Sequence, residues 1–482
     1  MTVADEASGP SVEVTPIPGL VVVRLDVRED NRGWFKENWQ RDKMVGLGLP
    51  DFGPVQHNVS FNTTRGATRG IHTEPWDKFV SILTGRVFGA WVDMREGATF
   101  GTVFTIEMDP SVAVFVPRGV GNSYQTLEDA TTYSYLVNEH WRPGTAYPAL
   151  NLADDSVAIA WPIPLDQAEI SEKDKSTPAM ADVVPMKPLK TLIVGALGQL
   201  GRALQADFPD ADLVDIVAGP DGSAVRVLDV SDSVQLEAFP WHEYSLVLNA
   251  AGYTAVDKAE TADGRSAAWA ANASAPAALA RLAAEHRLTL VHYSTDYVFD
   301  GTAEVHTEDE RYSPLGVYAQ TKAAGDIAVA TAPRHYIVRT SWVIGEGHNF
   351  VRTMQKLAAE GASPTVVDDQ VGRLTFTPDL SRATRHLVDS GAPYGIYNVT
   401  GSGPVTSWAE LAQEVFRLSG RAPEDVTPVT TEEYVAGREG ISPRPANGVL
   451  DLSKIEATGF TPGNHLDQLK DYCASQTVDQ RP

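Results

Sequence analysis

Tyr318 and Lys322 lie four residues apart in the stretch YAQTKAAGDIAV, which has the pattern of a helix. Side chains at this spacing lie on the same face of a helix. A tyrosine hydroxyl has a pKa of about 10, and a neighbouring ammonium group favours the phenolate and lowers that pKa. The pair therefore predicts a proton donor that is adjusted by a lysine, with Thr295, at the end of the strand pattern LTLVHYSTDY, beside it.

A glycine-rich turn precedes this pair in the chain. The apolar residues 192–194 predict a buried strand, and Gly195, Gly198 and Gly201 follow it at the spacing G-x-x-G-x-x-G. Glycine permits a tight turn, a close approach of the backbone to a pyrophosphate, and packing of the next helix on the strand. An ordinary strand-turn-helix can show the same spacing, so the turn and the Tyr-Lys pair together predict a dinucleotide site.

The first half of the chain carries a second group of candidates. Polar side chains stand where core strands would be apolar, namely Asp30, Arg32, Glu37, Gln56, Asn58, Arg69, His72, Lys78, Tyr133 and Tyr135. Each alone could be a solvated or structural residue, whereas together they predict a basic pocket with a base and a proton donor. Removal of a proton beside a ketone needs a base and a group that stabilises the enolate, and inversion needs a donor on the opposite face.

Two kinds of element must position these residues. Before about residue 187, short runs rich in Val, Phe, Tyr and Ile alternate with turn residues and predict a β-sandwich or small barrel. From residue 188 on, strand and helix patterns alternate as in a doubly wound parallel sheet, including a strand over 225–230 and one long helix over 266–286. The domains expected are 1–187 and 188–482, with a proline-containing connector at about 175–188.

The composition limits the classes of function. The 482 residues contain 39 Lys and Arg against 63 Asp and Glu, a net charge of −24, which argues against nucleic acid and anionic membranes as partners. No run approaches the roughly 18 apolar residues of a membrane span. The chain has 1 cysteine, Cys473, which is compatible with the reducing cytoplasm expected as its location.

At RGIH, PRGVGNSY and SEKD the first half resembles the dTDP-4-dehydrorhamnose 3,5-epimerases, a cupin family with a jelly-roll fold, over most of residues 15–175. The resemblance implies that His72 is the general base, Asp174 its orienting partner and Tyr135 the acid on the opposite face, and that Lys78 stabilises the enolate oxygen. It places Arg32 and Arg69 at the diphosphate. The other substrate-binding candidates are Glu37, Gln56, Asn58 and Asn122.

Asn122 departs from this family, because most of its members carry histidine at that place, as metal-binding cupins do. His72 is followed by Glu74 with no second histidine between them, so no catalytic metal is expected. The departure leaves open a first domain that binds a sugar nucleotide without turning it over.

The strings VGALGQLG, NAAGYTAVDKAE, STDYVFDG, YAQTKAAGD and DDQVGRLTFTPDL resemble the extended short-chain dehydrogenase/reductases with a Rossmann fold, and more narrowly the dTDP-4-dehydrorhamnose reductases. The resemblance covers nearly all of residues 190–455. It implies that Tyr318 donates a proton to the C4 oxygen, that Lys322 lowers its pKa and binds the nicotinamide ribose, and that Thr295 orients the carbonyl. The cofactor contacts implied are Gly195, Gly198, Gln199, Leu200, Gly201, Asp229, Asn249, Ala250 and Ala251, besides Tyr318 and Lys322.

The choice between NADPH and NADH stays open at this stage. The stretch VAGPDGSAVR offers neither a clean acidic anchor for the ribose nor a clear arginine pair. Arg444 is a candidate for a nucleotide phosphate, with a loop charge as the alternative.

The two resemblances together imply a bifunctional enzyme of dTDP-L-rhamnose synthesis. It would epimerise dTDP-4-dehydro-6-deoxy-D-glucose at C3 and C5 and then reduce the C4 ketone with NADPH or NADH. Two alternatives stay open: a reductase whose first domain only binds the sugar nucleotide, and a dinucleotide-binding regulatory subunit without turnover. The partner expected is the dTDP-sugar substrate, with no nucleic acid and no membrane, and a homodimer is left open.

Overall fold

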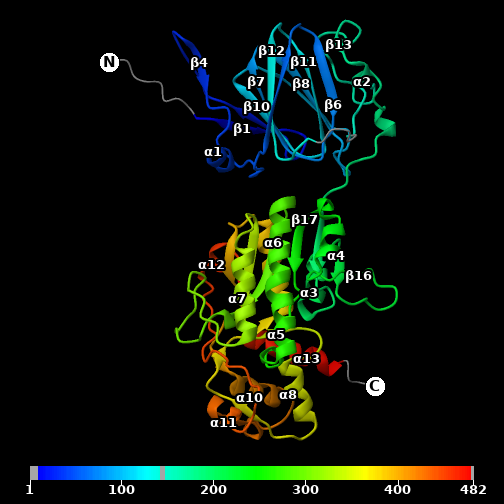
Figure 1. The fold of residues 1–482 in the computed structure, drawn as a ribbon. Coiled ribbons are helices and arrows are strands. Elements are labelled where there is room, and N and C mark those ends of the chain that lie inside the picture. The colour runs from blue at the N-terminus through cyan, green and yellow to red at the C-terminus, as the bar shows by residue number, and fades with distance from the viewer. Residues whose placement is uncertain (1–8, 142–146, 479–482) are drawn as a thin grey trace. The chain divides into compact units, whose positions relative to one another are not determined.

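The computed structural model describes residues 9–141 and 147–478 of the chain. It divides into two compact units, Met1–Pro188 and Leu189–Pro482 (Figure 1). Among the helices of the described residues, none is both long and apolar enough to cross a membrane.

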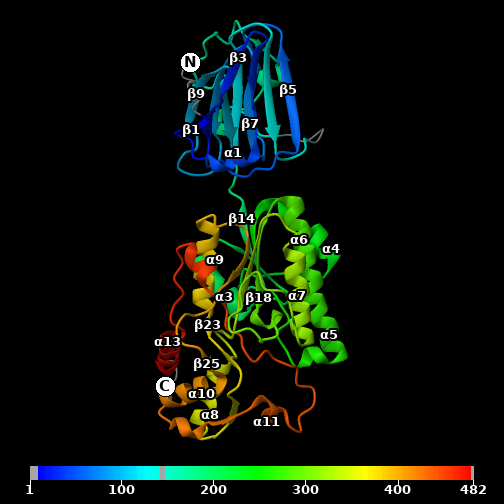
Figure 2. The same cartoon turned by 90° about the vertical axis from the view of Figure 1, so that its left-hand side faces the viewer.

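The first unit is built from two largely antiparallel sheets that pack face to face (Figure 2). The six-stranded sheet has the order β1 (Ser11–Val14), β2 (Val21–Arg24), β10 (Val112–Val116), β7 (Lys78–Thr84), β12 (Thr131–Val137) and β5 (Gln56–Asn62). The five-stranded sheet has the order β13 (Glu169–Ile170), β6 (Ala67–His72), β11 (Val120–Thr126), β8 (Val87–Asp93) and β9 (Val103–Met108), with β13 parallel to β6. Apolar residues of both sheets, such as Ile82 and Trp91, form the core between them. The predicted all-β jelly-roll fold is confirmed.

Shorter elements surround this sandwich. The hairpin of β3 (Val27–Asp30) and β4 (Gly33–Lys36) projects from it, and α1 (Arg41–Gly46) follows (Figure 1). After β13 come α2 (Glu172–Lys175) and the turn η1 (Met180–Asp182).

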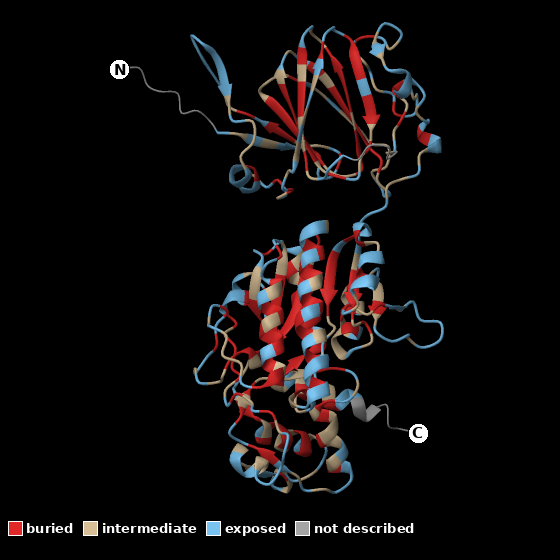
Figure 3. Cartoon of the chain, in the orientation of Figure 1, coloured by how far each residue is buried: buried red, intermediate tan, exposed pale blue. Residues whose placement is uncertain are grey.

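The second unit contains a seven-stranded parallel sheet. Its order is β16 (Arg226–Val227), β15 (Asp212–Asp215), β14 (Lys190–Val194), β17 (Tyr244–Asn249), β18 (Thr289–Thr295), β19 (His335–Thr340) and β24 (Gly395–Asn398). The first strand, β14, lies inside the sheet and the later strands extend from it in both directions, so the predicted doubly wound Rossmann fold is confirmed. The strands are largely buried because helices cover both faces (Figure 3).

The two helical layers have separate cores. One face packs against α4 (Ser233–Ala238), α6 (Ala275–His286) and α7 (Val317–Val329), with Leu236 and Leu279 in its core. The other face packs against α3 (Gln199–Asp207), α9 (Thr377–Asp389) and α12 (Ser453–Ala457), with Leu204 and Leu380 in its core (Figure 2).

The carboxyl-terminal part of this unit has a core of its own. Apolar faces of α8 (Phe350–Ala359), α10 (Trp408–Leu418) and α13 (His465–Val478) meet there.

Short elements complete the second unit. They include the strand pairs β20 (Val343–Ile344) with β23 (Thr375–Phe376), β21 (Thr365–Val367) with β26 (Thr427–Val429) and β22 (Val371–Gly372) with β25 (Thr406–Ser407), the helix α11 (Thr431–Val435), and the turns η2 (Trp241–Glu243), η3 (Lys258–Glu260), η5 (Asp296–Val298) and η6 (Pro423–Asp425).

Two sequence predictions in this unit are wrong in detail. The strand after the glycine turn is β15, which was not predicted, and the strand predicted over 225–230 is reduced to the two residues of β16. The helix predicted over 266–286 is α5 (Ala262–Trp269) and α6, joined by a π-helical turn, η4 (Ala270–Ser274). Asn272 in this turn receives a hydrogen bond from Tyr253 N (2.8 Å) and donates one to Tyr253 O (3.0 Å), so a local tertiary contact accompanies the departure from regular helix.

Candidate active sites

The first site is centred on His72, the last residue of β6. Its Nε2 lies 2.8 Å from Oδ1 of Asp174, a 6% exposed carboxylate on α2 that Ser171 caps. Burial raises the pKa of Asp174, but the hydrogen bond from His72 and further donors outweigh this effect and hold it below its ordinary value. An ionised carboxylate that accepts the N–H of His72 at Nε2 leaves a lone pair on Nδ1, which can take up a proton.

A cation and a proton donor lie close together on the opposite sheet. Lys78 on β7 is 4% exposed and forms an ion pair with Glu74, and its Nζ lies 5.8 Å from the centroid of the Tyr135 ring. Burial, followed by the charge of Glu74, raises the pKa of Tyr135, so its hydroxyl keeps its proton near neutral pH. The sequence does not predict this ion pair, because Glu74 stands in no motif that joins it to Lys78.

The side chain of Asn122 forms a hydrogen bond within the protein. It pairs with His72 across the β6–β11 ladder, and its Oδ1 accepts a hydrogen bond of 3.0 Å from the hydroxyl of Tyr133. Tyr133 in turn stacks on Tyr124 with ring centroids 4.0 Å apart. The asparagine therefore orients a buried tyrosine between the two sheets, a function that only the tertiary structure reveals.

The predicted substrate-binding residues of this unit fall into two groups. The first group lies beside the tyrosines. Arg69 acts on the pKa of Tyr135, and its Nε donates to Asn62 Oδ1 (3.0 Å). Asn58 pairs with Tyr135 in the sheet and accepts a hydrogen bond from Gln56 (2.9 Å). Arg32, by contrast, lies on the projecting hairpin, where its side chain is 84% exposed and paired with Asp30. Glu37 pairs with Lys43. No contact among the described residues joins either of these two to His72, and their substrate role stays a prediction.

The glycine turn of the second unit connects β14 to α3 and allows the two to pack closely. Gly195 has φ +77°, and a Cβ on it would lie 2.6 Å from Ala251 N. A Cβ on Gly201 would lie 2.1 Å from Gly195 O, so α3 packs against β14 with no room for a side chain. Gly198 caps the nine-residue helix α3 and leaves its first N–H groups beside a cavity of about 650 Å³.

That cavity fits the adenosine half of a dinucleotide. Gly195, Gly198, Asp229, Ala250 and Ala251 line it, and their contact with a cofactor stays a prediction.

Asp215, at the end of β15, lines the cavity as well, and its Oδ2 accepts a hydrogen bond of 2.9 Å from Leu197 N in the turn. An acidic residue at this place of the fold binds the ribose hydroxyls of NAD. Asp215 was missed because the four-residue strand DLVD, with a charge at either end, was not recognised.

Two predicted cofactor contacts have other partners. Gln199 binds the loop after β20, since Oε1 accepts from Gly345 N (3.0 Å) and Nε2 donates to His348 O (3.1 Å), although the residue still lines the neighbouring cavity with Leu200. Asn249 is buried, with its amide nitrogen 3.1 Å from His292 Nδ1. Cofactor contact by these side chains stays a prediction.

Thr295, Tyr318 and Lys322 line one cavity of about 500 Å³, which shares Gly198 and Ala251 with the adenosine cavity. The Lys322 ammonium donates to Tyr293 O (2.5 Å) and lies 3.4 Å from His292 Nε2, and burial lowers its pKa to about 8. The structure thus brings together the three residues that the sequence placed on a strand end and a helix face.

That Lys322 lowers the pKa of Tyr318 stays a prediction, because in this structure other effects act on the tyrosine in the opposite direction. Burial of the hydroxyl, followed by the charge of Asp296, raises the pKa of Tyr318 above its ordinary value. The hydroxyl therefore holds its proton firmly, as a donor to a developing alkoxide must before the reaction.

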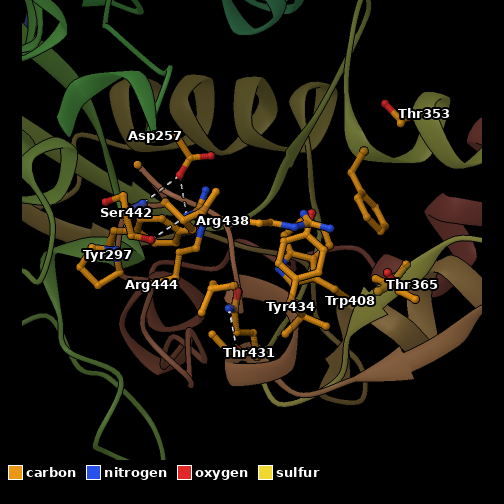
Figure 4. A pocket seen from close by; sticks show the side chains of 18 of the residues that line it. Asp257, Tyr297, Thr353, Thr365, Trp408, Thr431, Tyr434, Arg438, Ser442 and Arg444 are labelled. Atoms are coloured by element: carbon orange, nitrogen blue, oxygen red, sulfur yellow. Dashed lines mark hydrogen bonds and ion pairs between the residues drawn. The ribbon is translucent and has the colours of Figure 1, made fainter. Parts of the chain in front are cut away.

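A third cavity, of about 840 Å³, is shown in Figure 4 and shares the lining residues Tyr297, Phe350 and Trp408 with the catalytic one. Arg444 lines it and is held by Asp257 (Nη1 to Oδ1, 2.7 Å). Arg438 also lines it and stacks on Tyr434 at 4.0 Å from the ring centroid. Two cations and several aromatic rings suit an anionic nucleotide with a planar base. Arg438, Tyr434 and Trp408 carry no sequence motif and were missed as site residues.

Comparison with known proteins finds relatives of both units. A family model described as dTDP-4-dehydrorhamnose 3,5-epimerase matches residues 14–182. A protein of Streptococcus pyogenes named "Protein RmlC homolog" is 48% identical over 185 residues, which are 36% of this chain and 92% of that protein.

The second unit has relatives named as reductases. The dTDP-4-dehydrorhamnose reductase of Aggregatibacter actinomycetemcomitans is 36% identical over 296 residues, 58% of this chain and 97% of that protein. The dTDP-4-keto-6-deoxy-D-glucose reductase of Streptomyces niveus is 36% identical over 283 residues, 57% of this chain and 92% of that protein. The solved dTDP-4-dehydrorhamnose reductase of Bacillus anthracis in complex with NADP is 29% identical, with a TM-score of 0.52 over 60% of this chain and 99% of that one.

A family model described as RmlD substrate binding domain matches residues 189–478, more than half of the chain. The chain therefore belongs to the RmlD family through its second unit and to the dTDP-4-dehydrorhamnose 3,5-epimerase family through its first, and is a fusion of the two.

Proposed function

We propose that this chain carries out two consecutive reactions of dTDP-L-rhamnose synthesis. The first unit epimerises dTDP-4-dehydro-6-deoxy-D-glucose at C3 and C5, and the second reduces the C4 ketone to dTDP-L-rhamnose. The observation that carries the proposal is the presence of two complete sets of proton-handling groups in separate units. These are the His72–Asp174 pair at 2.8 Å with Lys78 and Tyr135, and Thr295, Tyr318 and Lys322 beside the glycine-turn cavity.

In the first unit, Nδ1 of His72 removes the proton from the carbon beside the ketone. The electron pair of that C–H bond moves to the C4 oxygen, and the Lys78 ammonium stabilises the enolate so formed. Tyr135 then delivers a proton to the opposite face of the carbon, which inverts it. Its raised pKa keeps that proton available until the enolate demands it.

In the second unit, a bound NADPH or NADH supplies the hydride that reduces C4. Tyr318 gives its proton to the C4 oxygen, Thr295 orients that oxygen by a hydrogen bond, and Lys322 provides a positive charge beside the resulting phenolate. Arg438 and Arg444 line the third cavity, where they would hold the diphosphate and keep the sugar beside Tyr318.

The residues present fit either dinucleotide. The B. anthracis relative was solved with NADP. Asp215 in the adenosine cavity favours NADH in this chain, because its carboxylate would repel a 2′-phosphate and accept a bond from a 2′-hydroxyl.

Hydrogen exchange separates the two activities. The protein is incubated with the keto-sugar in heavy water without a dinucleotide, and deuterium at C3 and C5 is followed by NMR. We expect label at both carbons, and oxidation of NADPH or NADH only when the cofactor is added. Reduction of pre-epimerised ketone without any labelling would leave the first unit as a binding module. Labelling without reduction would leave the second unit as a regulatory dinucleotide-binding domain.

We further propose a homodimer formed through the first unit, in the cytoplasm. The edge strand β5 exposes Val59 and Phe61, and the hairpin exposes Trp34 and Phe35, and a second copy would cover apolar side chains of this kind. Light scattering of the intact chain, compared with a Phe61→Asp variant, tests the dimer, since a monomeric wild-type protein would contradict it. The cytoplasm fits the single cysteine and the need for NADPH or NADH.

A further inference from the structure

Asp296 follows Thr295 at the carboxyl end of β18 and lines the catalytic cavity with it, although only 2% of Asp296 is exposed. Its Oδ1 accepts a hydrogen bond of 2.9 Å from the Thr295 hydroxyl. Its Oδ2 is buried and has no hydrogen-bond partner among the described residues. The backbone closes over that oxygen, because a Cβ on Gly448 would lie 2.4 Å from it. The mechanism proposed above does not use this carboxyl.

The charged groups around Asp296 do not neutralise it. On α7, Lys322 donates instead to Tyr293 O, and Tyr318 is neutral. On its own turn, Tyr297 is neutral, and beyond it Arg444 pairs with Asp257. Burial, partly offset by the bond from Thr295, raises the pKa of Asp296 to about 7. The group therefore exchanges its proton near neutral pH.

The hydroxyl of Thr295 has one proton to donate. When Asp296 is ionised, that proton is held by Oδ1 and cannot reach a ketone in the cavity. When Asp296 is protonated, its O–H can donate to Thr295 Oγ1, which turns the threonine proton outward. Thr295 Oγ1 also accepts a hydrogen bond of 3.2 Å from Tyr297 N, which uses no threonine proton, so the direction of the bond to Asp296 decides where that proton points.

We propose that Asp296 is a positioning residue of the reductase, whose protonated carboxyl donates to Thr295 Oγ1 and so directs the threonine hydroxyl to the C4 oxygen. This inference rests on the reductase function proposed above. It predicts that reduction slows as the pH rises through the pKa of Asp296, because the ionised form takes the threonine proton back. Tyr318, with its raised pKa, stays protonated there, whereas burial lowers the pKa of Lys322 to about 8, so a variant of Asp296 is needed to tell the two titrations apart.

Three variants separate this role from simple packing. In Asp296→Asn the amide donates permanently to Thr295, so we expect a kcat close to that of the wild type at about pH 6 and the loss of the fall near neutral pH. In Asp296→Leu no donor remains, and we expect kcat to fall by about tenfold to a hundredfold at every pH with an unchanged KM for the dinucleotide. Asp300→Asn, on the same segment but outside the cavity, is the matched control and should keep the wild-type pH profile.

Infrared difference spectra supply a readout that needs no turnover. A protonated carboxyl band should be present in the wild type at about pH 6, vanish at about pH 9, and be missing at both in Asp296→Asn. The proposal is overturned if the band does not change, if Asp296→Asn keeps the wild-type pH profile, or if it is as slow as Asp296→Leu at low pH. A wild-type protein that fails to oxidise NADPH or NADH with any keto-sugar contradicts the reductase function itself, which is a different result.

Discussion

The substitution Asp174→Asn tests the first site most sharply. In the native protein the carboxylate accepts the Nε2 proton of His72, which makes Nδ1 the basic nitrogen. An amide at residue 174 would instead direct its own N–H at Nε2, so that the ring would carry its proton on Nδ1. The base would then have no lone pair facing the substrate, while the shape of the site would be preserved.

The expected loss of exchange rate in Asp174→Asn follows from the contact between His72 and Asp174. One hydrogen bond of 2.8 Å to a buried carboxylate selects the tautomer, since no other acidic side chain among the described residues bonds to His72. A carboxylate-to-amide change that inverts the tautomer of a catalytic histidine elsewhere costs about 10⁴ in kcat. That factor corresponds to about 5 kcal/mol in the activation free energy. We therefore expect exchange at C3 and C5 to slow by about three to four powers of ten.

The assay is deuterium incorporation into the keto-sugar in heavy water, measured by NMR at saturating substrate. Reduction of pre-epimerised ketone by the same sample is the internal control and should be unchanged. Asp182→Asn, on the turn after α2, serves as the matched variant. Exchange by Asp174→Asn within about threefold of the wild-type rate would refute the assignment of His72 as the base.

Four further predictions concern other parts of the chain. Tyr318→Phe should lower reduction by about 10²–10⁴ and spare deuterium exchange, and equal loss of both activities in a folded protein would contradict separate sites. Asp215→Ser should raise the ratio of kcat/KM for NADPH to that for NADH by about tenfold, because the negative charge in the adenosine cavity is removed; an unchanged ratio would place the adenine ribose elsewhere. Gly201→Ala should destabilise the second unit by about 1–3 kcal/mol in thermal unfolding, since the new Cβ would lie 2.1 Å from Gly195 O, while exchange by the first unit continues. The buried Asp93 carboxyl pairs with Arg95. Burial raises its pKa, but the bonds from Arg95 outweigh this effect and hold the pKa below its ordinary value. The stabilising effect of the ionised carboxylate is therefore present at neutral pH and lost as the pH falls below about 4, and Asp93→Asn should flatten that acid dependence in denaturant titrations.

Local patterns were sufficient for the elements whose side chains repeat with a clear period. The runs KFVSIL and RVFGAWVD form β7 and β8, and YAQTKAAGDIAV forms α7. The order of apolar and polar residues along these runs indicates which faces of the element are buried. Short or irregular elements were not predictable in this way. The four residues of β15 are held by neighbouring strands, and the π-helical turn η4 accompanies a contact between Asn272 and Tyr253.

The same division applies to the sites. Residues inside a motif, such as His72, Thr295, Tyr318 and Lys322, could be named from their types and spacing. Arg438 could not, since it stands in a loop and acquires its place only when that loop folds beside Tyr434 and the third cavity.

By itself, the sequence determined that two different folds are joined and which motif residues could move protons, because both properties depend on neighbours along the chain. The tertiary structure alone decided which groups face one another. It paired Asn122 with Tyr133, placed Asp215 in the adenosine cavity and enclosed Asp296 behind Gly448. Such pairings form only between elements that the fold brings together, and the burial that shifts pKa values exists only after the sheets and helices have packed.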